Sequence, residues 1–304
     1  MIKTTYIRGV RAALLIATAF AGTPGATAAP APEHHVGKMI WADLVTPDLA
    51  AAERFYGELF GWRFDEPAAG KASYAVGRLD GRPVCGILQR AVPPGEHRQP
   101  AWLPFFAVRS VDKAWASALK AGASRLAAPK TYKSRGRQAV LGDPQGAPFG
   151  VLAARAGDPP DVLAEPGEWI WASLLTSDPA LAAGFYQSLF DYEVFDLPNR
   201  SPADAASSGA DGVQHLILSS GEYARASING MPADGALRHP HWIEFVRVAD
   251  VQAAVDHARA LGGMMLVAPH VDRHGGRVAV VADPFGAPVG LMEWAAADGS
   301  TEAK

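Results

Sequence analysis

Trp41-Ala42-Asp43-Leu44 recurs as Trp171-Ala172-Ser173-Leu174, 130 residues further along the chain. Phe55-Tyr56 and Phe60 return at the same offset, as Phe185-Tyr186 and Phe190. A later stretch, Gly136-Arg137 with Asp143-Pro144-Gln145-Gly146-Ala147, returns at an offset of 140 as Gly276-Arg277 with Asp283-Pro284-Phe285-Gly286-Ala287. A repeat of this length predicts two homologous domains in tandem, the second about ten residues longer.

Residues 1–28 have the composition of a secretory signal peptide. Basic Lys3, Arg8 and Arg11 precede the apolar run 12–21, and small residues end at Ala28. The run is too short to span a bilayer. We therefore expect cleavage after Ala28, a periplasmic or secreted protein, and no membrane anchor on the mature chain. The alternative is an N-terminal core helix, which the Ala-, Pro- and Gly-rich stretch 22–33 disfavours.

Charge and length limit the class of protein. The net charge is −3 with no long run of one sign, so the sequence does not predict a nucleic-acid partner. The single cysteine, Cys85, lies in an apolar run and is interpreted as a small buried residue rather than a nucleophile. A mature chain of roughly 275 residues is long enough for two domains, each with its own core.

Each domain reads as two copies of one module. The first has a strand over 39–45, a helix that begins after Asp48, and strands over 62–65, 73–79 and 84–89, the last two joined by the hairpin turn Asp80-Gly81. The order restarts with a strand over 102–108, a helix over 111–121 and strands near 124–127, 138–141 and 149–153. The second domain matches, with its first helix after Asp178.

The pattern gives the domain boundaries. Domain 1 is predicted over 36–156 and domain 2 over 169–297, with the Pro-rich segment 157–168 as linker. The insertion 199–212, rich in Ala, Ser, Asp and Gly, accounts for the change of offset and is expected to be a mobile loop. If the two domains pair with each other inside the chain, a monomer suffices.

These features together resemble the vicinal oxygen chelate superfamily of glyoxalases, bleomycin-resistance proteins and extradiol dioxygenases, and more narrowly its tandem glyoxalase-like proteins. The resemblance rests on the paired module, the Asp that opens the first helix, Leu59-Phe60-Gly61-Trp62 and the closing Asp-Pro-x-Gly-Ala turn, and it covers residues 38–295. It implies an α+β fold of four βαβββ modules, paired into two domains with cupped mixed β-sheets.

The resemblance also implies where metal ligands would stand. Enzymes of the superfamily place His, Gln or Glu on the first strand of each module and on the last strand. Here those positions hold the following residues: Trp41, Leu103, Gly150, Trp171, Ile243 and Gly290. None offers a lone-pair donor for a metal. We therefore predict neither a metal nor another cofactor, and propose that each Trp, facing a Gly on a neighbouring strand, partly fills the metal's space; plain core filler is the alternative.

Other polar residues are candidates for a ligand site. Asp43 lies two residues after Trp41, so both side chains point to the cavity face; it is a candidate ligand anchor or general base, or else pairs with a backbone N–H or an Arg. The second domain has Ser173 there, which suggests that only one pocket works. Arg137 and Arg277 are candidates for binding an anionic ligand at the pocket mouth, with a structural ion pair as the alternative.

Glu244 and the histidines are not interpreted as functional residues. Glu244 is expected to have a partner or an exposed face, because an unpaired carboxylate in a strand is costly to bury. The histidines His34-His35, His239, His241, His270 and His274 are interpreted as exposed and not metal-binding.

The sequence leaves two functions open. The first is an exported glyoxalase-like protein that binds a small organic molecule, of unknown identity, without metal chemistry, through Trp41, Asp43, Trp171, Ser173, Arg137 and Arg277. The alternative is a glyoxalase-like lyase or a dioxygenase-type enzyme that uses displaced metal ligands or acid–base catalysis by Asp43. Fold alone does not decide between them.

Overall fold

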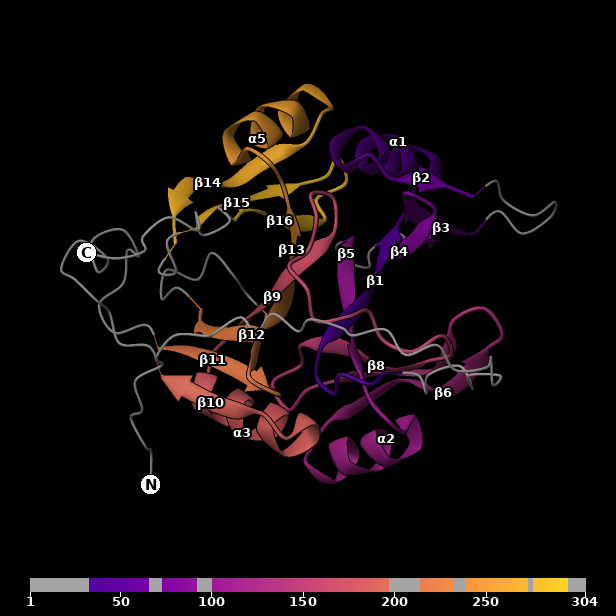
Figure 1. The fold of residues 1–304 in the computed structure, drawn as a ribbon, viewed down its shortest axis with the longest axis vertical. Helices are drawn as coiled ribbons and strands as arrows, with labels where there is room; N and C mark the ends of the chain where they lie inside the picture. Colours follow the sequence, from indigo (N-terminus) through magenta and orange to yellow (C-terminus); the bar gives the residue numbers. More distant parts are fainter. Residues whose placement is uncertain are drawn as a thin grey trace, which may run out of the picture. The chain divides into compact units, whose positions relative to one another are not determined.

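The computed structural model describes residues 33–65, 73–91, 100–196, 214–231, 239–272 and 276–294 (Figure 1). All of them belong to one compact unit, Pro32–Lys304. Among these residues, none of the helices has the length and apolar character needed to cross a membrane. The predicted signal peptide, the insertion 199–212 and His274 lie outside the described residues.

Domain 1 forms one eight-stranded sheet in the order β2-β3-β4-β1-β5-β8-β7-β6. Its elements are β1 (Met39–Thr46), α1 (Leu49–Phe60), β2 (Arg63–Phe64), β3 (Tyr74–Leu79), β4 (Arg82–Gln89), β5 (Ala101–Ala107), α2 (Val111–Lys120), β6 (Ser124–Tyr132), β7 (Gly136–Gly142) and β8 (Pro148–Ala154). The two modules join where β1 pairs with β5 in antiparallel register, while β1 is parallel to β4 and β5 is parallel to β8.

Domain 2 repeats this topology as β10-β11-β12-β9-β13-β16-β15-β14. Its elements are β9 (Trp169–Thr176), α3 (Pro179–Phe190), β10 (Glu193–Asp196), β11 (His215–Ser220), β12 (Tyr223–Gly230), β13 (His241–Arg247), α5 (Val251–Ala260), β14 (Met264–Val271), β15 (Arg277–Ala282) and β16 (Pro288–Glu293). The predicted fold is therefore confirmed: α+β, with four βαβββ modules paired into two mixed sheets.

Local sequence signals account for the helix starts and the first hairpin. The carboxylates of Asp48 and Asp178 accept hydrogen bonds from backbone N–H groups in the first turns of α1 and α3. Asp80 and Gly81 both have positive φ, which is the backbone conformation that a two-residue hairpin turn requires.

The helix-covered faces of the two sheets pack against each other. One core joins the first module of domain 1 to the second module of domain 2, and the other joins the two remaining modules. The helices follow the same pairing, because α1 contacts α5 and α2 contacts α3 (Figure 1). The expectation that each domain buries its own core is therefore wrong on this face. Each module needs a module of the other domain to cover its helix.

A reciprocal pair of buried hydrogen bonds links the domains. Tyr56 on α1 donates to Asp283 of domain 2 at 3.2 Å, and Tyr186 on α3 donates to Asp143 of domain 1 at 3.1 Å. The other oxygen of each aspartate accepts two backbone N–H groups of its own turn, all at 2.9 Å. Burial raises the pKa of both tyrosines, so that the hydroxyls stay protonated and donate. Each Asp-Pro-x-Gly-Ala turn is thus also an interdomain contact.

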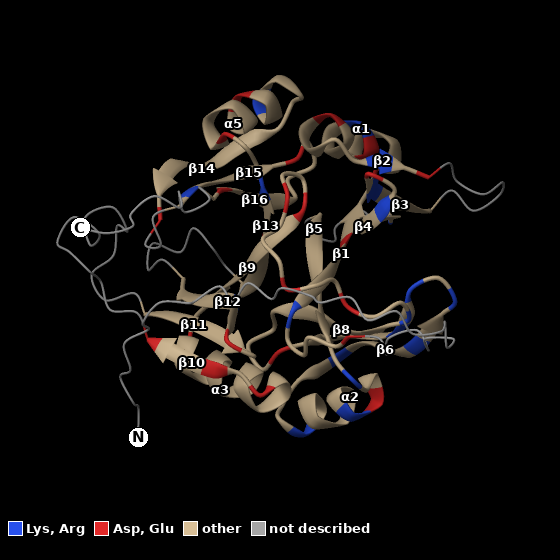
Figure 2. Cartoon of the chain, in the orientation of Figure 1, with Lys and Arg blue, Asp and Glu red and all other residues tan. Residues whose placement is uncertain are grey.

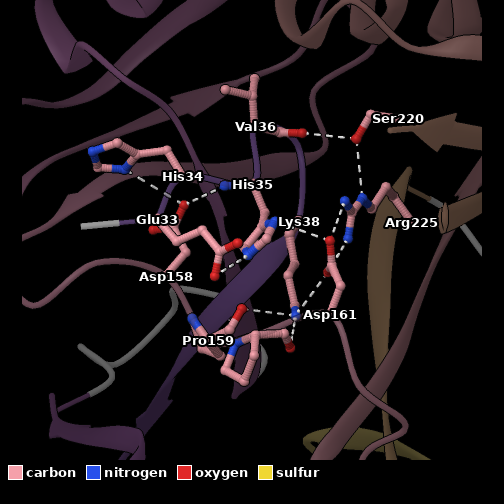
Figure 3. A network of polar contacts seen from close by, with 11 residues as sticks. Glu33, His34, His35, Val36, Lys38, Asp158, Pro159, Asp161, Ser220 and Arg225 are labelled. Carbon is pink, nitrogen blue, oxygen red and sulfur yellow. Dashed lines mark hydrogen bonds and ion pairs between the residues drawn. The ribbon is translucent and has the colours of Figure 1, made fainter. Parts of the chain in front are cut away.

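The segment before β1 contacts the linker between the domains, residues 157–168, through a network of polar side chains (Figure 3). Asp161 is its centre: its carboxylate accepts hydrogen bonds from Lys38 and Arg225 and lies 2.9 Å from a ring nitrogen of His35. Although burial opposes ionisation, these cations lower the pKa of Asp161 to about 2. The prediction that His35 is exposed is wrong, because its side chain is 14% exposed and faces Asp161. His239 and His270, by contrast, are exposed as predicted.

Glu244 differs from its prediction. It lies on β13 between Trp242 and Val246, is 0% exposed, and neither carboxylate oxygen has a hydrogen-bond partner among the described residues. Trp242 belongs to one shared core and Val246 to the other, so Glu244 lies where the two cores meet. Burial raises the pKa of Glu244 to about 8. The carboxyl group is therefore neutral at pH 7, which lowers the cost of burying it.

The two edge strands are longer than the sequence predicted. β6 continues from Ser124 through Pro129 to Tyr132, and β14 continues through Pro269 to Val271. Proline is compatible with a strand only at a sheet edge or a bulge, and both strands are edges with irregular register near the proline.

The reciprocal tyrosine bonds predict a stability loss. Tyr56→Phe and Tyr186→Phe each leave a buried aspartate oxygen without its donor, so we expect each to lower the free energy of unfolding by about 1–3 kcal/mol. Urea denaturation measures this free energy for each variant. Tyr223→Phe, at an exposed position of β12, is the control and should change little. Equal midpoints for Tyr56→Phe and the control would contradict the assignment.

Glu244 predicts a pH dependence. Its pKa is about 8 in the folded protein, against an ordinary value of 4.5. Between pH 4.5 and pH 8 the folded state therefore keeps a proton that the unfolded state has lost. Stability should therefore fall as pH rises from about 4.5 to about 8, by up to about 1.4 kcal/mol per pH unit. Glu244→Gln should lack this component in urea titrations across the window. Parallel pH profiles of variant and wild type would show that the group does not titrate there.

Candidate functional site

The sheets of domains 1 and 2 are called sheet 1 and sheet 2, and the face of each sheet without helices is called its inner face. The inner face of sheet 1 carries the candidate site of domain 1. Alternation along β1 puts Ala42 and Leu44 into a shared core, and so Trp41 and Asp43 onto the inner face. Trp41 packs there with Phe105 of β5 and Leu152 of β8, bordered by Leu103. The inner face therefore presents aromatic and aliphatic side chains beside one carboxylate.

Asp43 is held by four hydrogen bonds from three residues. The guanidinium of Arg135 donates to both oxygens at 2.8 Å, the Trp41 indole N–H donates at 2.7 Å, and the Tyr74 hydroxyl donates at 3.0 Å. Three of these bonds reach one oxygen of Asp43 and the fourth reaches the other, so both oxygens are engaged and both pair with Arg135. The alternative that Asp43 pairs with an arginine is confirmed, and this geometry disfavours Asp43 as a general base.

Arg135 completes the cluster and was not singled out from the sequence. It stands just before β7, and its guanidinium carbon lies 5.0 Å from the ring centroids of both Trp41 and Phe105. Burial disfavours its charge, but the hydrogen bonds and charge of Asp43 outweigh this and raise the pKa of Arg135. The side chains of Arg135 and Asp43 are 14% and 11% exposed, so a ligand approaching the inner face can touch them.

Tyr74 and Gly86 shape the same cluster. Gly86 is paired in register with Asp43, and a Cβ there would lie 2.0 Å from the Tyr74 hydroxyl and 2.3 Å from Asp43 Oδ1. Only glycine therefore leaves room for the Tyr74–Asp43 hydrogen bond. Burial, followed by the neighbouring carboxylate, raises the pKa of Tyr74, so its hydroxyl remains a donor.

The matching positions of domain 2 form a neutral network. Ser173 accepts hydrogen bonds from Asn229 at 2.7 Å and from Ser227 at 3.1 Å, and Ser227 accepts one from the Trp171 indole at 3.0 Å. His215, at the strand position of Tyr74, contacts the Asn229 side chain through Nδ1. The predicted difference between Asp43 and Ser173 thus extends to the groups around each of them.

The structure does not bring Arg137 or Arg277 to these clusters. Arg137 shares its face of β7 with Ala139 and Leu141, which pack under α2, and it binds Asp112 at 2.6 and 2.9 Å. The alternative of a structural ion pair is confirmed for Arg137. Arg277 is exposed and, by alternation with Ala279, lies on the helix-covered face of sheet 2.

The positions at which the superfamily places metal ligands do not fit a metal in this chain. Trp41 and Leu103 lie on the inner face without a free lone pair, and a Cβ on Gly150 would lie 2.2 Å from the ring of Phe105. No side chain that reaches a metal could replace that glycine without displacing the ring. Among the described residues, no three His, Cys, Asp or Glu side chains are grouped closely enough to hold a metal ion.

The expectation that Trp41 faces Gly150 on a neighbouring strand is wrong. Trp41 pairs with Phe105, and Phe105 pairs with Gly150, so β5 lies between them. Domain 2 has the same order, in which Phe245 separates Trp171 from Gly290. The large ring that requires each glycine is therefore the phenylalanine, a residue that sequence reasoning missed because the strand order was not known.

Two eight-stranded sheets, each built from two βαβββ modules, define the class of two-domain glyoxalase-like proteins. Residues 39–152 match the glyoxalase-like domain family, and residues 170–291 match the glyoxalase/bleomycin resistance protein/dioxygenase superfamily. The chain belongs to this superfamily.

Two relatives resemble the chain over nearly their whole length. CFP32 of Mycobacterium tuberculosis, named only provisionally as a glyoxylase, is 32% identical over 86% of this chain and 96% of its own. The anthracycline biosynthesis protein DauV of Streptomyces sp. strain C5 is 32% identical over 87% of this chain and 98% of its own.

Solved structures show the same fold. The Mn(II)-bound glyoxalase from Novosphingobium aromaticivorans aligns with a TM-score of 0.59 at 16% identity, covering 86% of this chain and 83% of that one. Homoprotocatechuate 2,3-dioxygenase from Brevibacterium fuscum aligns with a TM-score of 0.61 at 15% identity, covering 90% and 85%. At these identities the likeness concerns the fold alone.

The Phe105–Gly150 packing predicts the effect of a single methyl group. Gly150→Ala should lower the free energy of unfolding by about 1–3 kcal/mol, because the Cβ would overlap the ring. Gly184→Ala on α3, where a Cβ meets nothing within 4 Å, is the matched control and should be neutral or stabilising by about 0.5–1 kcal/mol. Urea denaturation of both variants compares them, and equal effects would refute the packing argument.

Proposed function

We propose that this protein is an exported, glyoxalase-like protein that binds a small organic molecule on the inner face of domain 1 without metal chemistry. The observation that carries the proposal is the cluster of Asp43, Arg135, Tyr74 and Trp41. It stands where the superfamily has a metal centre, and in place of metal ligands it supplies the guanidinium of Arg135, which is fixed by Asp43 and partly exposed.

The cluster supports a ligand with a flat apolar body and a polar edge. Trp41 and Phe105 are only 7% and 1% exposed, and Arg135 lies across both rings with its charge already balanced by Asp43, so its planar guanidinium is the surface on which a flat ligand would stack. A site of this kind binds mainly through apolar contact and uses its few polar groups for orientation. The name of DauV refers to the biosynthesis of anthracyclines, which are polycyclic aromatic compounds, so such compounds belong in the first ligand panel.

The proposal also concerns where the protein is located and how the two domains differ in ligand binding. The composition of residues 1–28 supports a periplasmic or secreted location. The neutral network around Ser173 supports a different or weaker affinity in domain 2. Acid–base catalysis by Asp43 is the less favoured function, since Arg135 binds both of its carboxylate oxygens.

A ligand-binding comparison tests the proposal. Polycyclic and monocyclic aromatic compounds are titrated calorimetrically into wild type, Asp43→Asn, Arg135→Lys and, as the domain 2 control, Ser173→Ala. We expect a ligand whose Kd rises at least about tenfold in the first two variants and stays unchanged in the control. Urea midpoints separate lost binding from lost folding.

Two results would overturn the proposal. One is equal affinity of wild type and Asp43→Asn for every ligand found. The other is about one tightly held metal per chain, measured by mass spectrometry on mature protein from cells grown with added zinc, nickel, manganese and iron, because it would require displaced ligands.

A further inference from the structure

β14, the edge strand of sheet 2, exposes an unusual run of apolar side chains. Met264, Met265, Leu266 and Val267 are 54%, 42%, 52% and 42% exposed, and Val271 at the other end of the strand is 62% exposed. Within the part of the chain that the structure describes, β14 pairs only with β15, so the backbone groups along its outer side have no strand partner there. Unpaired edges with apolar side chains are the common templates for strand pairing between chains.

The edge of sheet 1 provides an internal comparison. β6 occupies the same place in domain 1 and has the same irregular register near its proline. At the 140-residue offset, however, Arg125 stands in place of Met265 and Lys130 in place of His270. Charged side chains, lysine above all, are the usual protection of an edge strand. β6 has this protection and β14 does not, as the distribution of charge along the two strands shows (Figure 2).

We infer that β14 is an interface at which a second copy of this chain pairs edge to edge. A two-fold axis perpendicular to the sheet brings β14 antiparallel to its own copy, which is the arrangement in which two identical edges hydrogen-bond. Residues 264–267 contain no charge, so two copies meet without repulsion. The same operation on β6 would bring Arg125 and Lys130 of two copies together, and like charges in cross-strand positions are destabilising.

A second copy fits this edge better than residues 295–304 of the same chain do. The ten residues after Trp294 contain no large apolar side chain that could cover Met264 or Leu266. The helix-covered faces are already used by the pairing of the domains, so the proposed contact adds to that pairing and does not replace it. The inference is independent of the ligand proposed above.

A variant of β14 that carries the charged residues of β6 at the equivalent positions tests the inference. The mass of wild type, Met265→Arg/His270→Lys and, as a control, Leu126→Arg on β6 is measured by sedimentation over a wide range of micromolar concentrations. We expect a concentration-dependent dimer for wild type and for the control, and a Kd at least about tenfold higher for the double variant. A monomeric wild type, or a dimer that the double variant leaves intact, would overturn the inference.

Crosslinking at matched positions locates the contact. Leu266 and Leu126 are sequence-equivalent and 52% and 56% exposed, and the single cysteine, Cys85, is buried. A short bismaleimide should link Leu266→Cys into dimers well below the concentration at which it links Leu126→Cys. Equal yields from the two variants would place the contact elsewhere and refute the β14 interface.

Discussion

The reciprocal hydrogen bonds Tyr56–Asp283 and Tyr186–Asp143 are the interaction on which the rest of the structure depends. Each aspartate closes its own turn through backbone N–H groups and at the same time accepts from a helix of the other domain. Trp102 and Trp242 donate to the same tyrosine hydroxyls, so strand, helix and turn meet at one buried point in each half. Burying an ionised carboxylate is costly unless its oxygens are bonded. The other domain therefore completes the hydrogen bonding of each aspartate.

This constraint decides which surfaces remain for function. Because both helix-covered faces are used in pairing the domains, recognition is left to the inner faces and to the sheet edges. On the inner face of domain 1, Asp43 and Arg135 form an ion pair framed by aromatic rings, whereas the described matching positions of domain 2 hold Ser173, Ser227, Asn229 and His215. One framework thus carries two inner faces of different chemistry, and the difference arises within a few residues of Asp43 and Ser173.

The repeat, the helix caps and the Asp80-Gly81 turn could be predicted because each depends on residues close together in the sequence. What could not be predicted depends on contacts between distant residues. Arg135 reaches Asp43 from a turn 92 residues away. Phe105, not Trp41, requires Gly150, because β5 lies between the other two strands. A rule about buried charge predicted a partner or an exposed face for Glu244, but the side chain is buried without a partner among the described residues, and burial raises the pKa of its carboxyl group.

The two halves of the chain also separate what the fold requires from what it permits. The residues that bond across the interface, Tyr56 with Asp283 and Tyr186 with Asp143, are the same types in both halves, because each half must complete the other. Among the residues that face neither interface, some differ: Asp43 is replaced by Ser173, and Arg125 by Met265. A position that can change from carboxylate to hydroxyl without loss of the sheet has no structural need for charge. In domain 1 that charge is balanced by Arg135, and this pair is the feature on which the proposed ligand site rests.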